Sequence, residues 1–173
     1  MSDKESWSIW DHITGECFQG QHKGKKLEVW PIAMTTVAAA LEAHPDLEVS
    51  FSDFKGFKSR LMQRLHRNTI EGKGFLPPPF YKTMATDIDD RLDKLTQGLG
   101  VIVGNEGKFY PMHIVPKGES FADVWQERPL KIERGAIDGV PKAIWLDTGE
   151  IPMQLLTRWY GFSFTYPHCE IYS

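Results

Sequence analysis

The stretch SWSIWDHITGECFQGQHKGKKLEVWP, residues 6–31, decides the fold of this chain. It places Gly15, Gly20 and Gly24 between short runs of apolar and polar residues. Because glycine adopts positive φ at low cost, this spacing predicts tight turns or bulges between short strands. We expect strands at 8–10, 16–18 and 27–30, joined by turns at 12–15 and 20–24.

The same stretch resembles a known family. It fits the pattern S-x-W-x-x-x-T-G-x-x-x-x-G-x-x-x-G-x-x-L, made here by Ser8, Trp10, Thr14, Gly15, Gly20, Gly24 and Leu27. Later segments fit as well: Ala43-His44-Pro45-Asp46, Asp90-Arg91-Leu92, Leu99-Gly100-Val101, Gly107 and Tyr110-Pro111. This pattern is similar to that of an uncharacterised, mainly bacterial family, domain of unknown function 3179. The family carries a Cys-Pro-x-Cys stretch and an export signal in many members, and this sequence shows neither. The resemblance therefore implies no metal or redox role and names no reaction.

Composition indicates an ordinary globular protein. The 173 residues are 41% hydrophobic and 25% charged, a balance that excludes disorder and suits a single domain over residues 1–173. The net charge of −3 argues against nucleic-acid binding. No apolar run has the length of a signal peptide or a membrane span, so we expect a cytoplasmic protein with no membrane contact. The oligomeric state stays open.

The rest of the chain predicts an α+β fold, a mainly antiparallel sheet with two or three short helices. Thr35 or Thr36 can cap a short helix that ends before His44-Pro45. We expect a strand at 47–51, followed by a helix from Ser52 or Asp53 that has Phe54, Phe57, Leu61 and Leu65 on one face. We also expect a hairpin of strands 99–103 and 108–115, and further strands at 129–134 and 142–146. Pro111 interrupts the second hairpin strand and so predicts an edge position or a bulge.

A weak internal repeat is also present. Residues 35–50 and 157–173 share a threonine, a short helical run, His44-Pro45 or Tyr166-Pro167, and then Glu48-Val49 or Glu170-Ile171. This predicts a pseudo-twofold arrangement of units 6–52 and 129–173 around an inserted middle segment.

Several charged or turn motifs have two interpretations. The basic stripe Lys55, Lys58, Arg60, Arg64 and Arg67 is a solvated helix face or an anion site; the run Pro77-Pro78-Pro79 is a stiff connection or a docking segment. The cluster Asp87-Ile88-Asp89-Asp90-Arg91 is a helix N-terminus that favours negative charge, an Arg91 ion pair, or a cation site. Asp147-Thr148-Gly149 is a turn, or half of an aspartic-protease dyad that needs a second chain.

Cysteine and histidine offer one candidate site. No histidine pair has metal-ligand spacing, but Cys17, His22 and His113, with His168-Cys169 also considered, can form a soft nitrogen and sulfur set for zinc, copper or haem iron. Cys17 with His12 or His22 can also act as a nucleophile, or be a buried, inert thiol.

Aromatic residues offer the other candidate. The chain is rich in Trp and Tyr, and aromatic walls with a few polar groups make small-molecule pockets. We expect Trp10, Thr14, His22 and Tyr110 to line such a pocket. The leading hypothesis is a cytoplasmic small-ligand-binding or interaction domain without chemistry of its own. The alternative is a small enzyme or metalloprotein using the Cys17, His22 and His113 neighbourhood, with the ligand and cofactor unknown in both cases.

Overall fold

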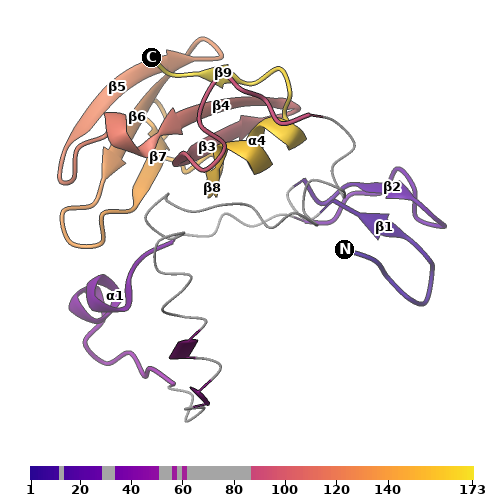
Figure 1. Cartoon of the computed structure of the whole chain (residues 1–173), viewed down its shortest axis with the longest axis horizontal. Coiled ribbons are helices and arrows are strands. Elements are labelled where there is room, and N and C mark those ends of the chain that lie inside the picture. Colours follow the sequence, from indigo (N-terminus) through magenta and orange to yellow (C-terminus); the bar gives the residue numbers. More distant parts are fainter. Residues whose placement is uncertain (12–13, 29–33, 51–55, 58–59, 62–86) are drawn as a thin grey trace. The chain divides into compact units, whose positions relative to one another are not determined.

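The computed structural model describes residues 1–11, 14–28, 34–50, 56–57, 60–61 and 87–173. These residues form mainly antiparallel strands and short helices, which confirms the predicted α+β class (Figure 1). The chain divides into two compact units, Met1–Ile32 and Ala33–Ser173. Each unit is described by itself below, and the prediction of a single domain stays a prediction.

Some predicted features lie outside the described residues. They are residues 12–13 of the turn expected at 12–15, the end of the strand expected at 27–30, most of the helix expected from residue 52, all of the basic stripe except Arg60, and the Pro77-Pro78-Pro79 run. The strand expected at 27–30 is wrong over residues 27–28, which are described and form no strand. Phe57, Arg60 and Leu61 are described and are helical, as predicted.

The first unit is built on a short antiparallel pair. β1 (Ile9–Trp10) pairs with β2 (Cys17–Gln19), and their register shifts between Ile9 and Trp10. Gly15, Gly20 and Gly24 have φ of 74°, 98° and 86°, which confirms the predicted turns and bulge. Gly20 is tightly constrained, because a Cβ there would lie 2.3 Å from the Trp7 carbonyl oxygen, whereas a Cβ at Gly24 would meet nothing within 4 Å.

Helix α1 (Val37–Ala43) confirms the expected short helix. The Thr36 side chain accepts a hydrogen bond from the Ala39 N–H, and the helix ends at His44. The strand expected at 47–51 is wrong over residues 47–50, which form no strand. Leu47 is exposed, so the alternation here marks no buried face.

Over residues 87–173 the second unit contains two sheets and the helix α4 (Trp159–Thr165) (Figure 1). A four-stranded sheet has the order β8 (Met153–Arg158), β3 (Gln97–Val103), β4 (Glu106–Pro111), β9 (Glu170–Ile171). A three-stranded sheet has the order β5 (Ser120–Trp125), β6 (Arg128–Arg134), β7 (Pro141–Trp145). All pairs are antiparallel except β4 with β9.

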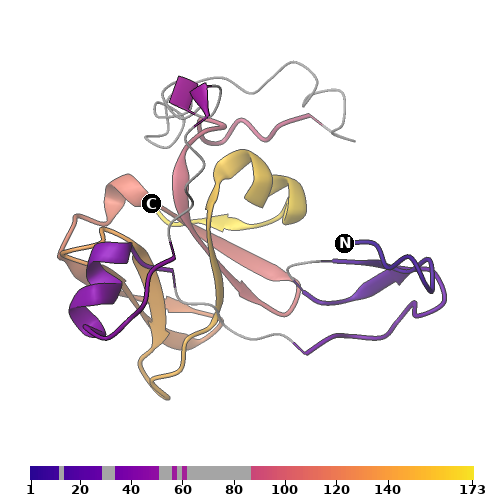
Figure 2. The same ribbon diagram turned by 90° about the horizontal axis from the view of Figure 1, so that it is seen from below.

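Side-chain alternation explains how these layers pack. Leu99, Val101 and Tyr110 point to one face of the four-stranded sheet and join a buried cluster with Leu130 and Trp145 of the other sheet. The opposite face receives helix α4, seen beside the sheet in Figure 2. Gly100 makes this approach possible, since a Cβ there would lie 2.2 Å from the Phe162 ring.

The predicted hairpins are confirmed with one correction. β3 and β4 are joined at Gly104, and β6 and β7 at a turn that includes Gly139; both glycines have positive φ. The second hairpin strand does not continue to residue 115, however. It ends at Pro111, and Met112–Ile114 form a 3₁₀ turn, η1. Proline has no N–H to continue the ladder, so the chain leaves the sheet there.

The pseudo-repeat is not confirmed. α1 and α4 each span seven residues and each is followed by a turn. The second helix leads into β9, whereas residues 47–50 after the first form no strand. The likeness between the two segments is therefore limited to a helix and its turn.

Candidate functional site

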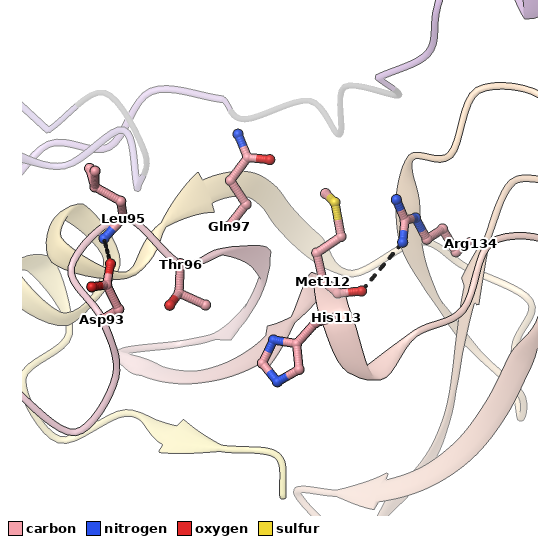
Figure 3. Close-up of a pocket in the computed structure, with 7 residues that line it drawn as sticks. All are labelled: Asp93, Leu95, Thr96, Gln97, Met112, His113 and Arg134. Atoms are coloured by element: carbon pink, nitrogen blue, oxygen red, sulfur yellow. Dashed lines mark hydrogen bonds between the residues drawn. The ribbon is translucent and has the colours of Figure 1, made fainter. Parts of the chain in front are cut away.

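A cavity of about 400 Å³ lies in the second unit, where the start of β3 and the end of β6 meet η1 (Figure 3). Residues from three parts of the chain line it: the approach to β3 and its first residue, the start of η1, and the last residue of β6. They are Asp93, Leu95, Thr96, Gln97, Met112, His113 and Arg134. The lining contains a carboxylate, a hydroxyl, an amide, an imidazole and a guanidinium.

Backbone hydrogen bonds fix the wall that precedes β3. The Leu95 N–H donates to Asp93 Oδ1 over 2.8 Å, and the Thr96 N–H donates to the Asp93 carbonyl over 2.9 Å. The Thr96 carbonyl in turn accepts from the Trp159 N–H at 2.8 Å. Because Trp159 and Leu95 are buried, this wall is anchored in the core.

Pro111 creates the opposite wall. β4 ends at this residue, and the chain turns into η1, whose Met112 carbonyl accepts from the Val115 N–H. Without that turn, Met112 and His113 would continue along the sheet. In Figure 3 the Met112 and Gln97 side chains extend to one side of this turn and the His113 ring to the other.

Arg134 closes one end of the cavity and is held by backbone carbonyls. Its Nε donates to the Gly139 carbonyl at 2.7 Å, and its Nη1 lies 3.2 Å from the Val115 carbonyl and 3.5 Å from that of Met112. The side chain is half-buried. Within the part of the chain that the structure describes, no carboxylate forms an ion pair with it.

A second cation lies beside Arg134. A Cβ at Gly139 would lie 3.7 Å from Arg134 Nη2 and 3.6 Å from Lys117 Cε, so both side chains border the same glycine. The Asp138 carboxylate is close as well, but it accepts from the Val140 N–H and from the Thr35 hydroxyl. These bonds, the first above all, hold the pKa of Asp138 below its usual range.

Of the residues predicted from sequence, His113 lines this cavity and Tyr110 does not. The Tyr110 ring is fully buried between the sheets, and its hydroxyl donates to Asp123. Burial, followed by the bond to that carboxylate, raises the pKa of Tyr110 well above its usual value.

The other predicted ligand residues lie in the first unit. The Trp10 and His22 rings are 6.0 Å apart between centroids, and Trp10 pairs with Cys17 across the two strands. The Thr14 N–H donates to Asp11, and the Thr14 hydroxyl accepts from the Glu16 N–H. Trp10 and His22 are therefore together, while their predicted meeting with Tyr110 concerns the placement of two units and stays a prediction.

The predicted metal set is divided in the same way. Cys17 is buried, and its thiol donates to the Gln19 carbonyl; His22 Nδ1 lies 3.1 Å from Lys25 Nζ. His113 belongs to the second unit. Among the residues described, no group of three or more His, Cys, Asp or Glu side chains is arranged to hold a metal ion. Both cysteines are buried free thiols.

The acidic cluster around Asp89 and the Asp147-Thr148-Gly149 turn each form an ion pair. Asp89 and Arg91 make a bidentate contact, with Nη2 to Oδ2 at 2.7 Å, and this bond lowers the pKa of Asp89. Asp147 occupies a turn before Gly149, as predicted, and pairs with Arg128 at 2.9 Å. The ion-pair interpretation of the acidic cluster is thus confirmed.

Sequence reasoning missed most of the cavity lining. Thr96, Gln97, Met112 and Arg134 carry no motif, and only the Pro111 interruption pointed to this part of the chain. Arg134 stands just before the Gly135–Gly139 turn, a position that by itself does not separate a buried arginine from a surface one.

The described residues form a small α+β protein with a cavity of about 400 Å³. The chain belongs to the protein family of unknown function DUF3179, whose family model matches residues 1–136. This confirms the resemblance seen in the sequence. No curated protein and no solved structure gives a significant match. Within the described residues, every helix is too short or too polar to cross a membrane.

Proposed function

We propose that this protein binds a small molecule in the cavity between the approach to β3, η1 and Arg134. The observation that carries the proposal is the cavity itself, whose volume of about 400 Å³ falls within the range usual for ligand pockets. The lining includes a hydroxyl, an imidazole and a guanidinium that can orient a polar ligand.

The anchoring of both walls supports binding. Hydrogen bonds at Asp93, Thr96 and Met112 hold the backbone before any ligand arrives. A site that is already formed loses little conformational entropy on binding, so modest contacts give measurable affinity.

We propose binding without chemistry as the main role. General acid–base or nucleophilic catalysis needs a base oriented by a second group. The His113 imidazole makes no side-chain hydrogen bond to another of the described residues, and the Cys17 thiol is turned to a backbone carbonyl. The alternative of a Cys/His metalloprotein has no comparable geometric support in those residues.

We also propose that the protein acts in the cytoplasm without nucleic-acid partners. Two buried free thiols fit a reducing compartment. The net charge of −3 gives no general attraction for a phosphate backbone.

A ligand screen on the full chain tests the proposed function. Thermal shift against a panel of small polar metabolites identifies binders, and calorimetry measures their dissociation constants. Thr96→Phe places a ring in the cavity, while Thr148→Phe adds the same ring to an exposed turn and serves as the control. We expect binders whose affinity falls at least tenfold in Thr96→Phe and is unchanged in Thr148→Phe. Binding that is equal in both variants, or no binding by the native chain, would overturn the proposal.

A further inference from the structure

We infer that the ligand of this cavity carries a single carboxylate group, which binds Arg134, and a hydroxyl or amino group directed toward Asp93. The ligand class is therefore a small hydroxy or amino acid. This inference rests on the proposed function and names the chemistry that the same site selects.

The donors of Arg134 show where an anion binds. A guanidinium has five N–H donors and no acceptor. Backbone carbonyls occupy Nε and Nη1 through the bonds to Gly139, Val115 and Met112, whereas Nη2 has no acceptor among the residues described. Its two N–H groups are available to a ligand oxygen.

Two other arginines of the second unit have carboxylate partners, whereas Arg134 has none within the described part of the chain. Arg91 is paired with Asp89, and Arg128 with Asp147, each through more than one nitrogen. Arg134 is instead held by neutral carbonyls, which fix its position without cancelling its charge. A rigid, half-buried cation whose counterion is not supplied by the described chain is arranged to receive an anion from outside.

The surrounding charges limit what that anion can be. Lys117 adds one cation beside Gly139, while Asp138 already contributes a carboxylate there. A phosphate carries more negative charge and three acceptor oxygens, which the two remaining N–H groups of Arg134 Nη2 cannot all satisfy. A carboxylate, with one charge and two oxygens, matches them.

Asp93 defines the other end of the ligand. It lies opposite Arg134 in Figure 3, and one of its carboxylate oxygens accepts from the Leu95 N–H. The other oxygen is directed to no donor in the described chain, so it can accept from a hydroxyl or ammonium group. A second carboxylate at that end would be repelled, which disfavours dicarboxylic acids.

Calorimetry with defined probes tests the inference on the full chain. The probes are 4-hydroxybutyrate and 4-aminobutyrate, whose polar group is separated from the carboxylate, and lactate, in which the two are adjacent; each is compared with its neutral amide, and with succinate and inorganic phosphate. We expect the monocarboxylates to bind about tenfold or more tightly than their amides, succinate and phosphate, because charge-assisted bonds to Arg134 are lost or opposed in the others.

Variants locate the contact. Arg134→Lys keeps the charge but loses the planar donor group, and we expect it to weaken carboxylate binding at least tenfold; Arg128→Lys, on the surface, is the matched control and leaves it unchanged. Should Arg134→Lys fail to fold, the affinities of the native chain for each acid and for its amide still show whether a carboxylate is required.

The outcomes separate the two proposals. If a ligand is excluded by Thr96→Phe but binds equally as acid and amide, or binds equally to Arg134→Lys, the inference is overturned and the proposed function stands. If no probe and no metabolite binds the native chain, both are overturned. If phosphate or succinate binds more tightly than lactate, the carboxylate assignment is wrong.

Discussion

The Tyr110 hydroxyl donates a hydrogen bond to Asp123 Oδ2 over 2.8 Å and so joins β4 to β5 across the core. Lys108 Nζ lies 2.7 Å from the same oxygen, and the aromatic ring of Tyr172 packs beside both, 5.4 Å from the Tyr110 ring between centroids. A polar group buried in this way is stable only while its partners are present.

Tyr110→Phe therefore lowers the free energy of unfolding by about 1.5–3 kcal/mol, the usual net value of a hydrogen bond to a charged group. Urea denaturation followed by tryptophan fluorescence measures the change. Tyr172→Phe removes a hydroxyl that forms no hydrogen bond with the other described residues, and we expect it to change stability by less than about 0.5 kcal/mol. Equal losses in the two variants would show that the Asp123 contact contributes nothing.

The turn between β5 and β6 stores backbone strain. Gln126 and Glu127 have φ of 54° and 59°, although neither is glycine or asparagine. Replacing them together by Asn-Gly, the pair that this two-residue turn favours, raises the free energy of unfolding by about 1–2 kcal/mol. Thermal denaturation of the double variant measures the gain.

Gly104→Ala, in the turn between β3 and β4, is the opposite change: it introduces backbone strain where glycine now avoids it. Gly104 has φ of 60° and a Cβ there would meet nothing within 4 Å, so the variant reports backbone strain alone. We expect a loss of about 1 kcal/mol. An Asn-Gly variant that melts below the native protein would contradict the strain argument.

Two glycines near α4 give opposite expectations. Gly100→Ala forces a methyl group against the Phe162 ring and lowers stability by about 2 kcal/mol or more. A Cβ added at Gly161, inside α4, would meet only the Thr157 hydroxyl at 3.7 Å, so Gly161→Ala raises stability by about 0.5–1 kcal/mol. Denaturant midpoints of the two variants on either side of the native value would bear out the close packing of helix and sheet.

The Asp89 and Arg91 pair makes stability depend on acid pH. The bond to Arg91 lowers the pKa of Asp89 in the folded state below its unfolded value of about 3.9. The ionised carboxylate therefore stabilises the fold fully above about pH 4, and this contribution is lost as the pH falls through the lowered folded pKa. Asp89→Asn is less stable than the native chain by about 1 kcal/mol at pH 7.

Urea denaturation of both proteins between pH 7 and pH 2 measures this difference. It should shrink as the solution becomes more acidic than about pH 4 and approach zero once Asp89 is protonated in both states. A difference that is the same at pH 7 and pH 2 would mean that the asparagine acts by altering packing.

Thiol chemistry tests the Cys/His alternative. Cys17 and Cys169 are both buried, and burial raises the pKa of Cys169. We expect a neutral-pH thiol reagent to react slowly with the folded protein and rapidly with both cysteines after denaturation. Fast reaction of Cys17 in the folded state, or a stoichiometric metal in elemental analysis, would instead support the metalloprotein hypothesis.

The sequence predicts the parts of this fold that glycine and proline mark. The hairpin at Gly104, the β6–β7 connection at Gly139 and the turns of the first unit follow from positions where only glycine adopts the backbone without strain. The cap at Thr36 is equally local, because it depends on one side chain and the N–H three residues later.

Tertiary contacts determine what the sequence does not predict. β5 was not expected because its turn, Gln126-Glu127, contains no turn-forming residue. β8 has six half-buried residues with no alternation, since it lies at a sheet edge and runs directly into α4. The cavity shares this origin: Arg134 acquires its role only when the carbonyls of Val115 and Gly139 surround it.

The strands after residue 136 complete sheets that the preceding strands begin. β8 is one of the two neighbours of β3, β9 pairs with β4, and β7 is a neighbour of β6. The region matched by the family ends at residue 136 and so cuts through this folding unit. An expression plasmid trimmed to that boundary would produce a polypeptide with unpaired sheet edges and a core that lacks Ala143, Trp145, Trp159 and Phe162, prone to inclusion bodies, whereas one that retains β7, β8, α4 and β9 supplies the missing strands.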